Sequence, residues 1–295
     1  YVDSAITSSI SLSSKSQTRV GIIISTYVLS GQSVFLKQLT KITEMSFKNK
    51  VVLITGGSSG IGAATAELFA KEGADIAIVA RNEVKLKNVA EKIEKLGAKI
   101  LVIKADVAID SDLKTIVKKT IDKFGKLDVL VNNAGILTLA TIEDENLIEI
   151  FDKTINTNLR STVYLTNLAV PYLIKTKGNV VNISSILGVT LLGTPHHLSY
   201  SVSKAGMDHF TRAAALQLMP SGVRVNTVSP GATRTDVLEN AGIESSWEDA
   251  VKNIDVGRVS EPEEIGDLIL FLASDKARSI TGANHFIDNG ALLKN

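Results

Sequence analysis

The stretch Val51-Val52-Leu53-Ile54-Thr55-Gly56-Gly57-Ser58-Ser59-Gly60-Ile61-Gly62 decides the fold of this chain. It begins as an apolar run, breaks into glycines and continues into a helical pattern, which predicts a buried strand, a tight turn and a helix N-terminus. Glycine has no Cβ, so the backbone can turn sharply there and approach a ligand. The first turn of the following helix offers unpaired N–H groups and the positive end of the helix dipole, and both suit a pyrophosphate.

The spacing of these glycines meets the general dinucleotide-binding fingerprint only in part. From Thr55 to Gly62 the chain reads T-G-x-x-x-G-x-G rather than G-x-G-x-x-G. A glycine-rich turn between a strand and a helix also occurs without any ligand. The rest of the chain therefore has to decide between a phosphate-binding turn and a plain one.

Beyond Lys50, apolar strand-like runs alternate with helical patterns in a regular order. This alternation is typical of a parallel sheet whose strands are joined by crossover helices. We expect strands at residues 51–55, 75–80, 99–104, 127–131, 178–184, 223–228 and 283–287. We expect helices near residues 60–72, 83–96, 110–124, 146–175, 199–219 and 262–274. The sequence thus predicts an α/β fold: a single doubly wound, Rossmann-like domain with a seven-stranded parallel sheet and helices on both faces.

The composition argues against several classes of protein. The 295 residues carry a formal net charge of +1, and Lys and Arg are interspersed with Asp and Glu, so we expect no nucleic-acid partner. The chain has no Cys, which rules out a disulfide framework, a thiolate nucleophile and a Cys-based metal site. The four His residues do not form a ligand pattern either, so no metal is expected. The lack of Cys fits a reducing compartment, and we expect a cytoplasmic protein.

Residues 1–44 differ from the remainder of the chain. They are rich in Ser and Thr and show no helical or strand periodicity. The apolar run at residues 20–29 is shorter than the roughly 20 residues that a membrane span needs. Three origins stay open: a targeting segment, upstream translation, or a cloning remnant before Met45. We expect residues 1–44 to be a disordered or non-native extension, and residues 45–295 to form the folded domain.

Ligands of doubly wound sheets bind at the carboxyl ends of the strands. The second predicted strand ends at Ala80-Arg81. A fold that selects NAD carries an acid here for the ribose 2′-OH, whereas an Arg can pair with a 2′-phosphate. Arg81 therefore favours NADP(H) over NAD(H), although a solvated Arg at a helix start is the alternative. The third strand ends at Asp106-Val107, where the Asp would accept from an adenine amine or cap the next helix.

Asparagines mark two further places. Asn132-Asn133-Ala134-Gly135 follows the fourth predicted strand, where small residues and side-chain amides let the backbone pass close to a ligand and brace a neighbouring strand. Asn156 and Asn158 lie inside the long predicted helix at 146–175, where Asn is disfavoured. We expect such a residue to bend the helix and free a carbonyl for water.

The chemistry-bearing residues follow the fifth predicted strand. The strand delivers Ser184-Ser185, and Tyr200 and Lys204 come after a loop, four residues apart and hence on one helix face. A tyrosine titrates near pH ~10, too high for acid–base work at neutral pH. A lysine cation about 4 Å away, at an effective dielectric of about 20, would lower this pKa by about three units. A serine hydroxyl nearby would hold the substrate oxygen.

With these motifs together, the chain resembles the short-chain dehydrogenase/reductase family from Phe47 to about Leu293. The resemblance implies that Tyr200 is the general acid/base, that Ser185 polarises the carbonyl, that Lys204 lowers the tyrosine pKa and binds the nicotinamide ribose, and that Asn158 anchors a proton-relay water. Because the interval before Tyr200 is two residues longer than is common in the family, Ser184 remains an alternative to Ser185. The implied cofactor-binding residues are Thr55, Gly56, Ser58, Ser59, Gly60, Ile61, Gly62, Arg81, Asp106, Val107, Asn133, Ala134, Gly135, Tyr200, Lys204, Pro230, Gly231, Thr233 and Thr235.

The resulting hypothesis is an NADP(H)-preferring oxidoreductase that interconverts a secondary alcohol and a ketone. Its alternatives are a catalytically idle cofactor-binding scaffold, or an epimerase or dehydratase on the same fold. The substrate pocket is expected from Ile136-Leu137, residues 186–199 and residues 237–255, whose apolar character favours an apolar small molecule. By resemblance, we also expect a homo-oligomer, either a tetramer or a dimer.

Overall fold

The computed structural model describes residues 47–191, 195–243, 247 and 257–294. Residues 45–295 form one compact unit. The predicted division of the chain at residue 44 stays a prediction, because residues 1–46 lie outside the described part. Among the helices that the structure describes, none combines the length and the apolar character of a membrane span.

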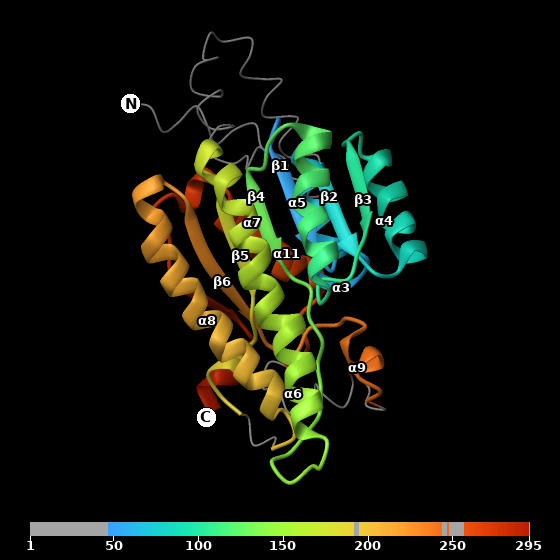
Figure 1. The fold of residues 1–295 in the computed structure, drawn as a ribbon, viewed down its shortest axis with the longest axis vertical. Helices are drawn as coiled ribbons and strands as arrows, with labels where there is room; N and C mark the ends of the chain where they lie inside the picture. Colours follow the sequence, from blue (N-terminus) through green and yellow to red (C-terminus); the bar gives the residue numbers. More distant parts are fainter. Residues whose placement is uncertain (1–46, 192–194, 244–246, 248–256, 295) are drawn as a thin grey trace, which may run out of the picture. The chain divides into compact units, whose positions relative to one another are not determined.

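A seven-stranded sheet forms the centre of the domain, as predicted (Figure 1). Its order is β3-β2-β1-β4-β5-β6-β7, and every neighbouring pair is parallel. The order reverses beside β1, so the carboxyl ends of β1 and β4 flank a switch point where ligands bind in such folds. The strands are β1 (Val51–Thr55), β2 (Asp75–Ala80), β3 (Ile100–Lys104), β4 (Val129–Asn132), β5 (Asn179–Ile183), β6 (Arg224–Pro230) and β7 (Asn284–Ile287).

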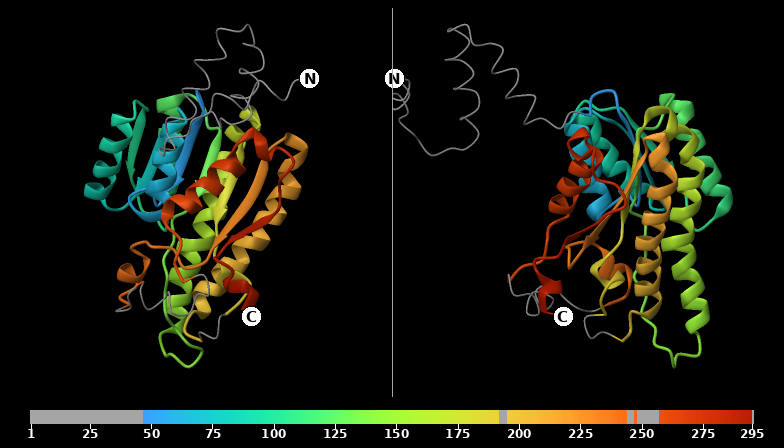
Figure 2. Two further views of the ribbon diagram at one scale, coloured as in Figure 1. Left: turned by 180° about the vertical axis from the view of Figure 1, so that it is seen from behind. Right: turned by 90° about the vertical axis from the view of Figure 1, so that its left-hand side faces the viewer.

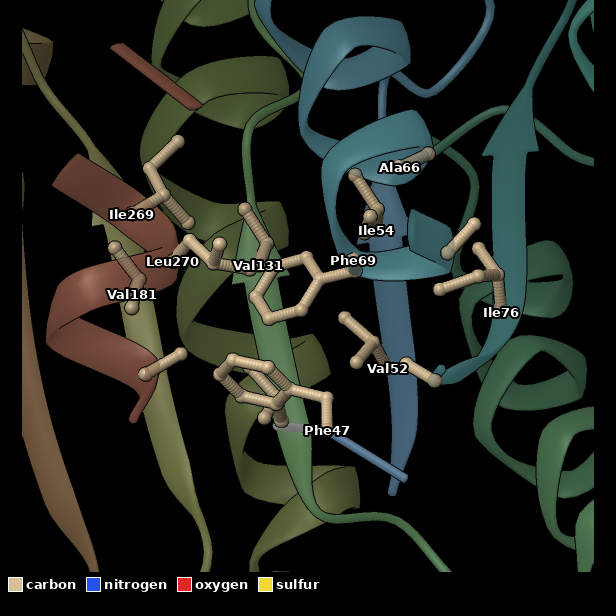
Figure 3. Close-up of a cluster of buried hydrophobic side chains, with 14 of the residues drawn as sticks. Phe47, Val52, Ile54, Ala66, Phe69, Ile76, Val131, Val181, Ile269 and Leu270 are labelled. Carbon is tan, nitrogen blue, oxygen red and sulfur yellow. The ribbon is translucent and has the colours of Figure 1, made fainter. Parts of the chain in front are cut away.

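Helices cover both faces of the sheet, and alternate residues of each strand serve the two faces. Val52 and Ile54 of β1 pack into one buried cluster with α3, α4 and α11, whereas Val51 and Leu53 pack into a second cluster with α5, α7 and α8. Figure 3 shows the first cluster, with Phe69 of α3 in its middle. The helices are α3 (Gly60–Lys71), α4 (Glu83–Lys95), α5 (Asp110–Phe124), α6 (Leu147–Ile155), α7 (Ser161–Thr176), α8 (Leu198–Leu218), α9 (Val237–Asn240) and α11 (Pro262–Ala273).

The two helical layers are visible from opposite sides. Helices α5, α7 and α8 lie in front of the sheet in Figure 1, and α11 lies in front of it when the molecule is seen from behind (Figure 2, left). Because both faces are covered, the central strands are buried along their length, which explains their continuous apolar runs.

One predicted helix is divided. Residues 146–175 were expected as a single helix, but α6 ends at Ile155 and a π-helical turn, η1 (Asn156–Arg160), precedes α7. The turn carries Asn158, which is fully buried, and single π-turns inside helices are frequent at functional sites. The helix therefore changes type at the asparagines, where a bend is expected.

Candidate active site

The glycine turn after β1 has the geometry of a phosphate cradle. Gly56 and Gly60 have positive φ angles of 67° and 51°, which only glycine adopts at no cost. A Cβ on Gly62 would lie 2.2 Å from the carbonyl oxygen of Gly56, so no larger residue fits there. Ser59 is the N-cap of α3 and makes no side-chain capping bond, which leaves the first N–H groups of the helix free for an anion. The turn therefore fits the pyrophosphate of a dinucleotide.

Thr55 and Asn133 brace this turn from beneath. The Thr55 hydroxyl accepts hydrogen bonds from the backbone N–H groups of Asn133 and Ala134, at 3.0 and 3.1 Å. The Asn133 side chain donates to the carbonyl oxygens of Thr55 and Gly56, at 2.9 and 3.2 Å. Thr55 is 3% exposed and its hydroxyl is engaged by the protein. It holds β1 to β4, and its role as a cofactor contact stays a prediction.

A buried chain of polar side chains, which the sequence analysis missed, supports the same edge of the sheet. Asn132 donates to Asn182 at 2.8 Å, and Asn182 donates to Thr211 at 2.9 Å. Thr227 extends the chain by donating to Thr211 at 2.7 Å. Side-chain amides at strand ends were the only signal in the sequence that could have found it. These hydrogen-bonded side chains fix β4, β5 and β6 against α8, which carries Tyr200.

Asn158 joins the π-turn to the strand end that carries Gly135. Its side-chain oxygen accepts from the N–H of Ile136 at 2.8 Å, and its amide donates to the carbonyl of Ile136 at 2.9 Å and to the Ser203 hydroxyl at 3.1 Å. The Asn158 carbonyl, expected to be freed for water, accepts from the Thr162 hydroxyl at 3.0 Å. A Cβ on Gly135 would lie 3.3 Å from the Asn158 side chain and 3.6 Å from the Lys204 ammonium. Asn158 and Lys204 thus face the same strand end.

The two serines after β5 point to different partners. The Ser185 hydroxyl is hydrogen-bonded to the Tyr200 phenol, and this bond lowers the pKa of Tyr200. Ser184 donates to the carbonyl of Lys204 at 3.2 Å and hydrogen-bonds Asp208. Ser185 is therefore the serine beside the tyrosine, despite the longer interval before Tyr200. The loop between them is held to the body by the Ala140 N–H, which donates to the His196 carbonyl at 2.7 Å.

The ionisation of Tyr200 differs from the expectation. Burial raises its pKa to about 12, and the hydrogen bond from Ser185 opposes this rise only in part. The Lys204 ammonium lies 5.5 Å from the centroid of the tyrosine ring and donates instead to the Ile183 carbonyl at 2.8 Å. The pKa of Tyr200 is therefore raised by burial and not lowered by Lys204 as predicted, because the ammonium contacts the Ile183 carbonyl. At neutral pH Tyr200 carries its proton.

Lys204 is itself perturbed, since its side chain is only 4% exposed. Burial lowers its pKa to about 8, and the nearby Asp208 carboxylate counteracts this. Asp208 lies one helical turn beyond Lys204 and is 6% exposed. Its Oδ2 accepts from the Asn284 amide at 3.0 Å, and burial raises its pKa. Sequence spacing places Tyr200, Lys204 and Asp208 on one helix face, and this spacing is the signal in the sequence that could have found Asp208.

The predicted residues near the adenosine lie at the carboxyl ends of β2 and β3. Arg81 is exposed, and its guanidinium is 3.8 Å from Asp106 Oδ2. Asp106 Oδ1 accepts from the Ala108 N–H at 2.9 Å, and Ile109 rather than Asp106 is the N-cap of α5. The capping alternative is thus wrong. Val107 is 8% exposed and packs in the core.

The segment after β6, residues 231–240, lies against the glycine turn. Pro230 ends β6, and the N–H of Gly231 donates to Ile287 at 3.0 Å. The Thr233 hydroxyl donates to the Gly231 carbonyl at 3.1 Å. A Cβ on Gly60 would lie 2.9 Å from the Thr235 methyl, so Thr235 faces the cradle. Of the predicted substrate pocket, residues 192–194, 244–246 and 248–255 lie outside the described part.

The sheet order, the glycine cradle and the polar strand ends define a dinucleotide-binding domain of the Rossmann type. A family model described as enoyl-(acyl carrier protein) reductase matches residues 56–291. The chain belongs to the short-chain dehydrogenase/reductase family. It is thus an oxidoreductase of a family that binds a nicotinamide cofactor and acts on small molecules.

Similar proteins include two curated relatives and a solved structure. The 3-oxoacyl-[acyl-carrier-protein] reductase of Thermotoga maritima is 38% identical over 253 residues, which cover 84% of this chain and 100% of the relative. Cyclohexanol dehydrogenase of Acinetobacter sp. is 35% identical over 259 residues, 87% of this chain and 100% of the relative. A short-chain dehydrogenase from Burkholderia cenocepacia in complex with NADP is 33% identical, with a TM-score of 0.77, and the match covers 83% of this chain and 98% of that one.

Proposed function

We propose that this protein is an NADP(H)-preferring oxidoreductase that interconverts a secondary alcohol and a ketone, with Tyr200 as general acid/base. The observation that carries the proposal is the convergence of Ser185, Tyr200 and Lys204 at the carboxyl end of β5, beside the glycine cradle. Each side chain supplies a different part of the chemistry, and no other arrangement of titratable groups near the cradle does so among the described residues.

The proposed roles follow from the contacts. With its pyrophosphate on the cradle, a nicotinamide dinucleotide would supply the hydride to the carbonyl carbon of the ketone, or accept it from the carbinol carbon of the alcohol. The Tyr200 hydroxyl donates the proton to the substrate oxygen during ketone reduction and takes it back during alcohol oxidation. Ser185 donates a hydrogen bond toward the same oxygen and holds it in line. Lys204, charged at neutral pH, is held in place by the Ile183 carbonyl and faces the strand end that carries Gly135. By resemblance, it would bind the ribose of the nicotinamide there.

Asn158 is proposed as the positioning residue of this group. It ties the π-turn to both backbone groups of Ile136 and to Ser203, whose hydroxyl donates to the Tyr200 carbonyl at 2.6 Å. These contacts fix the start of α8, and hence the tyrosine, relative to the end of β4. By resemblance, Asn158 also anchors a water that relays the proton.

The preference for NADP(H) rests on Arg81. Its exposed guanidinium lies at the carboxyl edge of the sheet, and no acid takes the place that an NAD-selecting fold would give one. The Burkholderia cenocepacia relative was solved with NADP, which supports the same cofactor here. A homo-oligomer is proposed as well, supported by apolar side chains exposed on α7 and α8, namely Val163, Val202 and Leu216.

The test is the absorbance of the reduced nicotinamide with NADPH, NADH and a panel of apolar secondary alcohols and ketones. The proposal expects turnover, with NADPH preferred. Replacing Arg81 by Asp should weaken the binding of NADPH by about 1.5–3 kcal/mol, or roughly ten- to hundred-fold in affinity. One charge-assisted contact is lost, and the new carboxylate repels the 2′-phosphate. Cofactor binding without turnover would instead indicate an idle scaffold. An unchanged ratio of the two cofactors in Arg81→Asp would refute the assignment of Arg81.

A further inference from the structure

An ion pair closes the outer side of the glycine turn. Lys85 of α4 and Asp236, which are 151 residues apart in the chain, meet with Nζ and Oδ2 at 2.7 Å. Asp236 also accepts a hydrogen bond from Ser59, and both bonds lower its pKa, the one from Lys85 more strongly. A carboxylate of the segment at residues 231–240 therefore joins α4 to the N-cap of α3.

These groups border a cleft of about 460 Å³. It lies between α3, α4 and the segment at residues 231–240, and Ser58, Ser59 and Gly60 of the glycine turn form one end of it. The same cleft contains a second ion pair, between Lys92 and Glu67 at 3.1 Å. Lys92 is two helical turns beyond Lys85, farther from the glycine turn.

The position of Lys85 directs its ammonium toward the end of β2. Asn82 is the N-cap of α4, and its side chain accepts from the Lys85 N–H at 3.0 Å. Lys85 is thus in the first turn of α4, four residues after Arg81. Long side chains in helices point back toward the helix N-terminus, which here is the carboxyl edge of the sheet.

The donors that Asp236 occupies are those an organic phosphate would use. An ammonium, a serine hydroxyl and an uncapped helix N-terminus form a set that favours an anion. The carboxylate takes two of these donors in the structure, the Lys85 ammonium and the Ser59 hydroxyl, so it marks where an anionic group is stabilised. Lys85 and Asp236 retain 45% and 32% of their side-chain exposure, and exposed ion pairs of this kind are weak. A phosphate, with a larger charge and three acceptor oxygens, can take the place of the carboxylate.

We propose that Lys85 is a second cation for the 2′-phosphate of the cofactor, and that Asp236 holds it until the phosphate takes its place. The inference rests on the proposed preference for NADP(H). It supplies the basic partner that the glycine turn itself lacks, since that turn carries only Ser58 and Ser59. It also couples cofactor binding to the segment at residues 231–240, because Asp236 must leave Lys85 when the phosphate arrives.

The experiment is isothermal titration of NADP⁺ and NAD⁺ into the wild-type protein and three variants. Lys85→Met should lower the affinity for NADP⁺ about tenfold, the value of one charge-assisted contact, and change the affinity for NAD⁺ by less than about twofold. Asp236→Asn should raise the affinity for NADP⁺ about threefold or more, because no carboxylate then competes with the phosphate for Lys85. Lys92→Met is the matched control, a paired lysine of the same helix and cleft, and should leave both affinities unchanged.

Three results with the lysine variants would overturn the inference. These are an unchanged affinity for NADP⁺ in Lys85→Met, an equal loss for both cofactors, or the same loss in Lys92→Met. Weaker NADP⁺ binding by Asp236→Asn would also contradict it, since the carboxylate would then support Lys85 rather than compete for it. A wild-type protein that prefers NAD⁺ would refute the proposed cofactor and this inference together. A preference for NADP⁺ that needs Arg81 but not Lys85 would refute this inference alone.

Discussion

Replacing Lys204 by Met is expected to stabilise the cofactor-free protein while abolishing its activity. Burial lowers the pKa of Lys204 from 10.5 to about 8. At about 1.36 kcal/mol per unit, the folded state at neutral pH therefore bears a cost of about 3 kcal/mol for keeping this lysine charged. Methionine fills a similar volume without a charge. The loss of the hydrogen bond to the Ile183 carbonyl offsets about 1–2 kcal/mol of the gain.

The difference in unfolding free energy between Lys204→Met and the wild type depends on pH, and this dependence isolates the contribution of the lysine charge. Below pH 8 the lysine is protonated in both the folded and the unfolded chain, and the full cost is present. Between pH 8 and 10.5 the unfolded chain binds the proton and the folded chain does not, so wild-type stability rises with pH relative to the variant. The cost falls by about 2–3 kcal/mol from pH 7 to pH 10, whereas the lost hydrogen bond changes little.

The assay is urea unfolding of both proteins at pH 7 and pH 10, without cofactor. The advantage of Lys204→Met should shrink, or reverse, at the higher pH by about 2–3 kcal/mol, which corresponds to roughly 5–10 °C in melting temperature for a domain of this size. An equal difference at the two pH values would show that Lys204 is not desolvated, and the reasoning about its pKa would then be refuted.

Three further perturbations follow from the same geometry. Gly62→Ala should destabilise the fold by more than about 2 kcal/mol in thermal unfolding, because its Cβ would lie 2.2 Å from the Gly56 carbonyl oxygen; a normal melting temperature would contradict the tight turn. Asp208→Asn should lower the pKa of Lys204 below about 8, since the carboxylate raises it, and the pH–rate profile should shift to lower pH; an unshifted profile would show no coupling. Alcohol oxidation should rise from pH 7 to 10, because a pKa of about 12 leaves Tyr200 protonated at neutral pH, whereas ketone reduction should not; parallel profiles would argue against this tyrosine as the titrating group.

The layers of the fold could be predicted because they depend on local patterns. Continuous apolar runs indicate strands that are buried on both faces, and glycines mark the turns between elements. As a result, β1 and β2 begin and end at the predicted residues. The break in the helix at residues 146–175 could be anticipated only as a bend. Its π-turn depends on contacts of Asn158 with Ile136 and Ser203, which are distant in sequence.

The electrostatics of the site could not be obtained from spacing. A spacing of four positions places Tyr200 and Lys204 on one helix face. The pKa of the phenol, however, depends on how deeply the ring is buried and on which group the ammonium contacts. Here the ammonium contacts the Ile183 carbonyl. The pair of Lys85 and Asp236 lies beyond sequence patterns for the same reason, because it joins segments separated by 151 residues.

The central claim is that Tyr200 transfers the proton between the protein and the substrate oxygen. It is tested most directly by following the reduced-nicotinamide absorbance for wild type and Tyr200→Phe with NADPH and a ketone that the wild type reduces, while NADP⁺ affinity is measured by titration. The account predicts that turnover falls to below a few per cent of wild type and that cofactor affinity is nearly unchanged, because the phenyl ring still packs in the site. Turnover above that level, with intact cofactor binding, would contradict it.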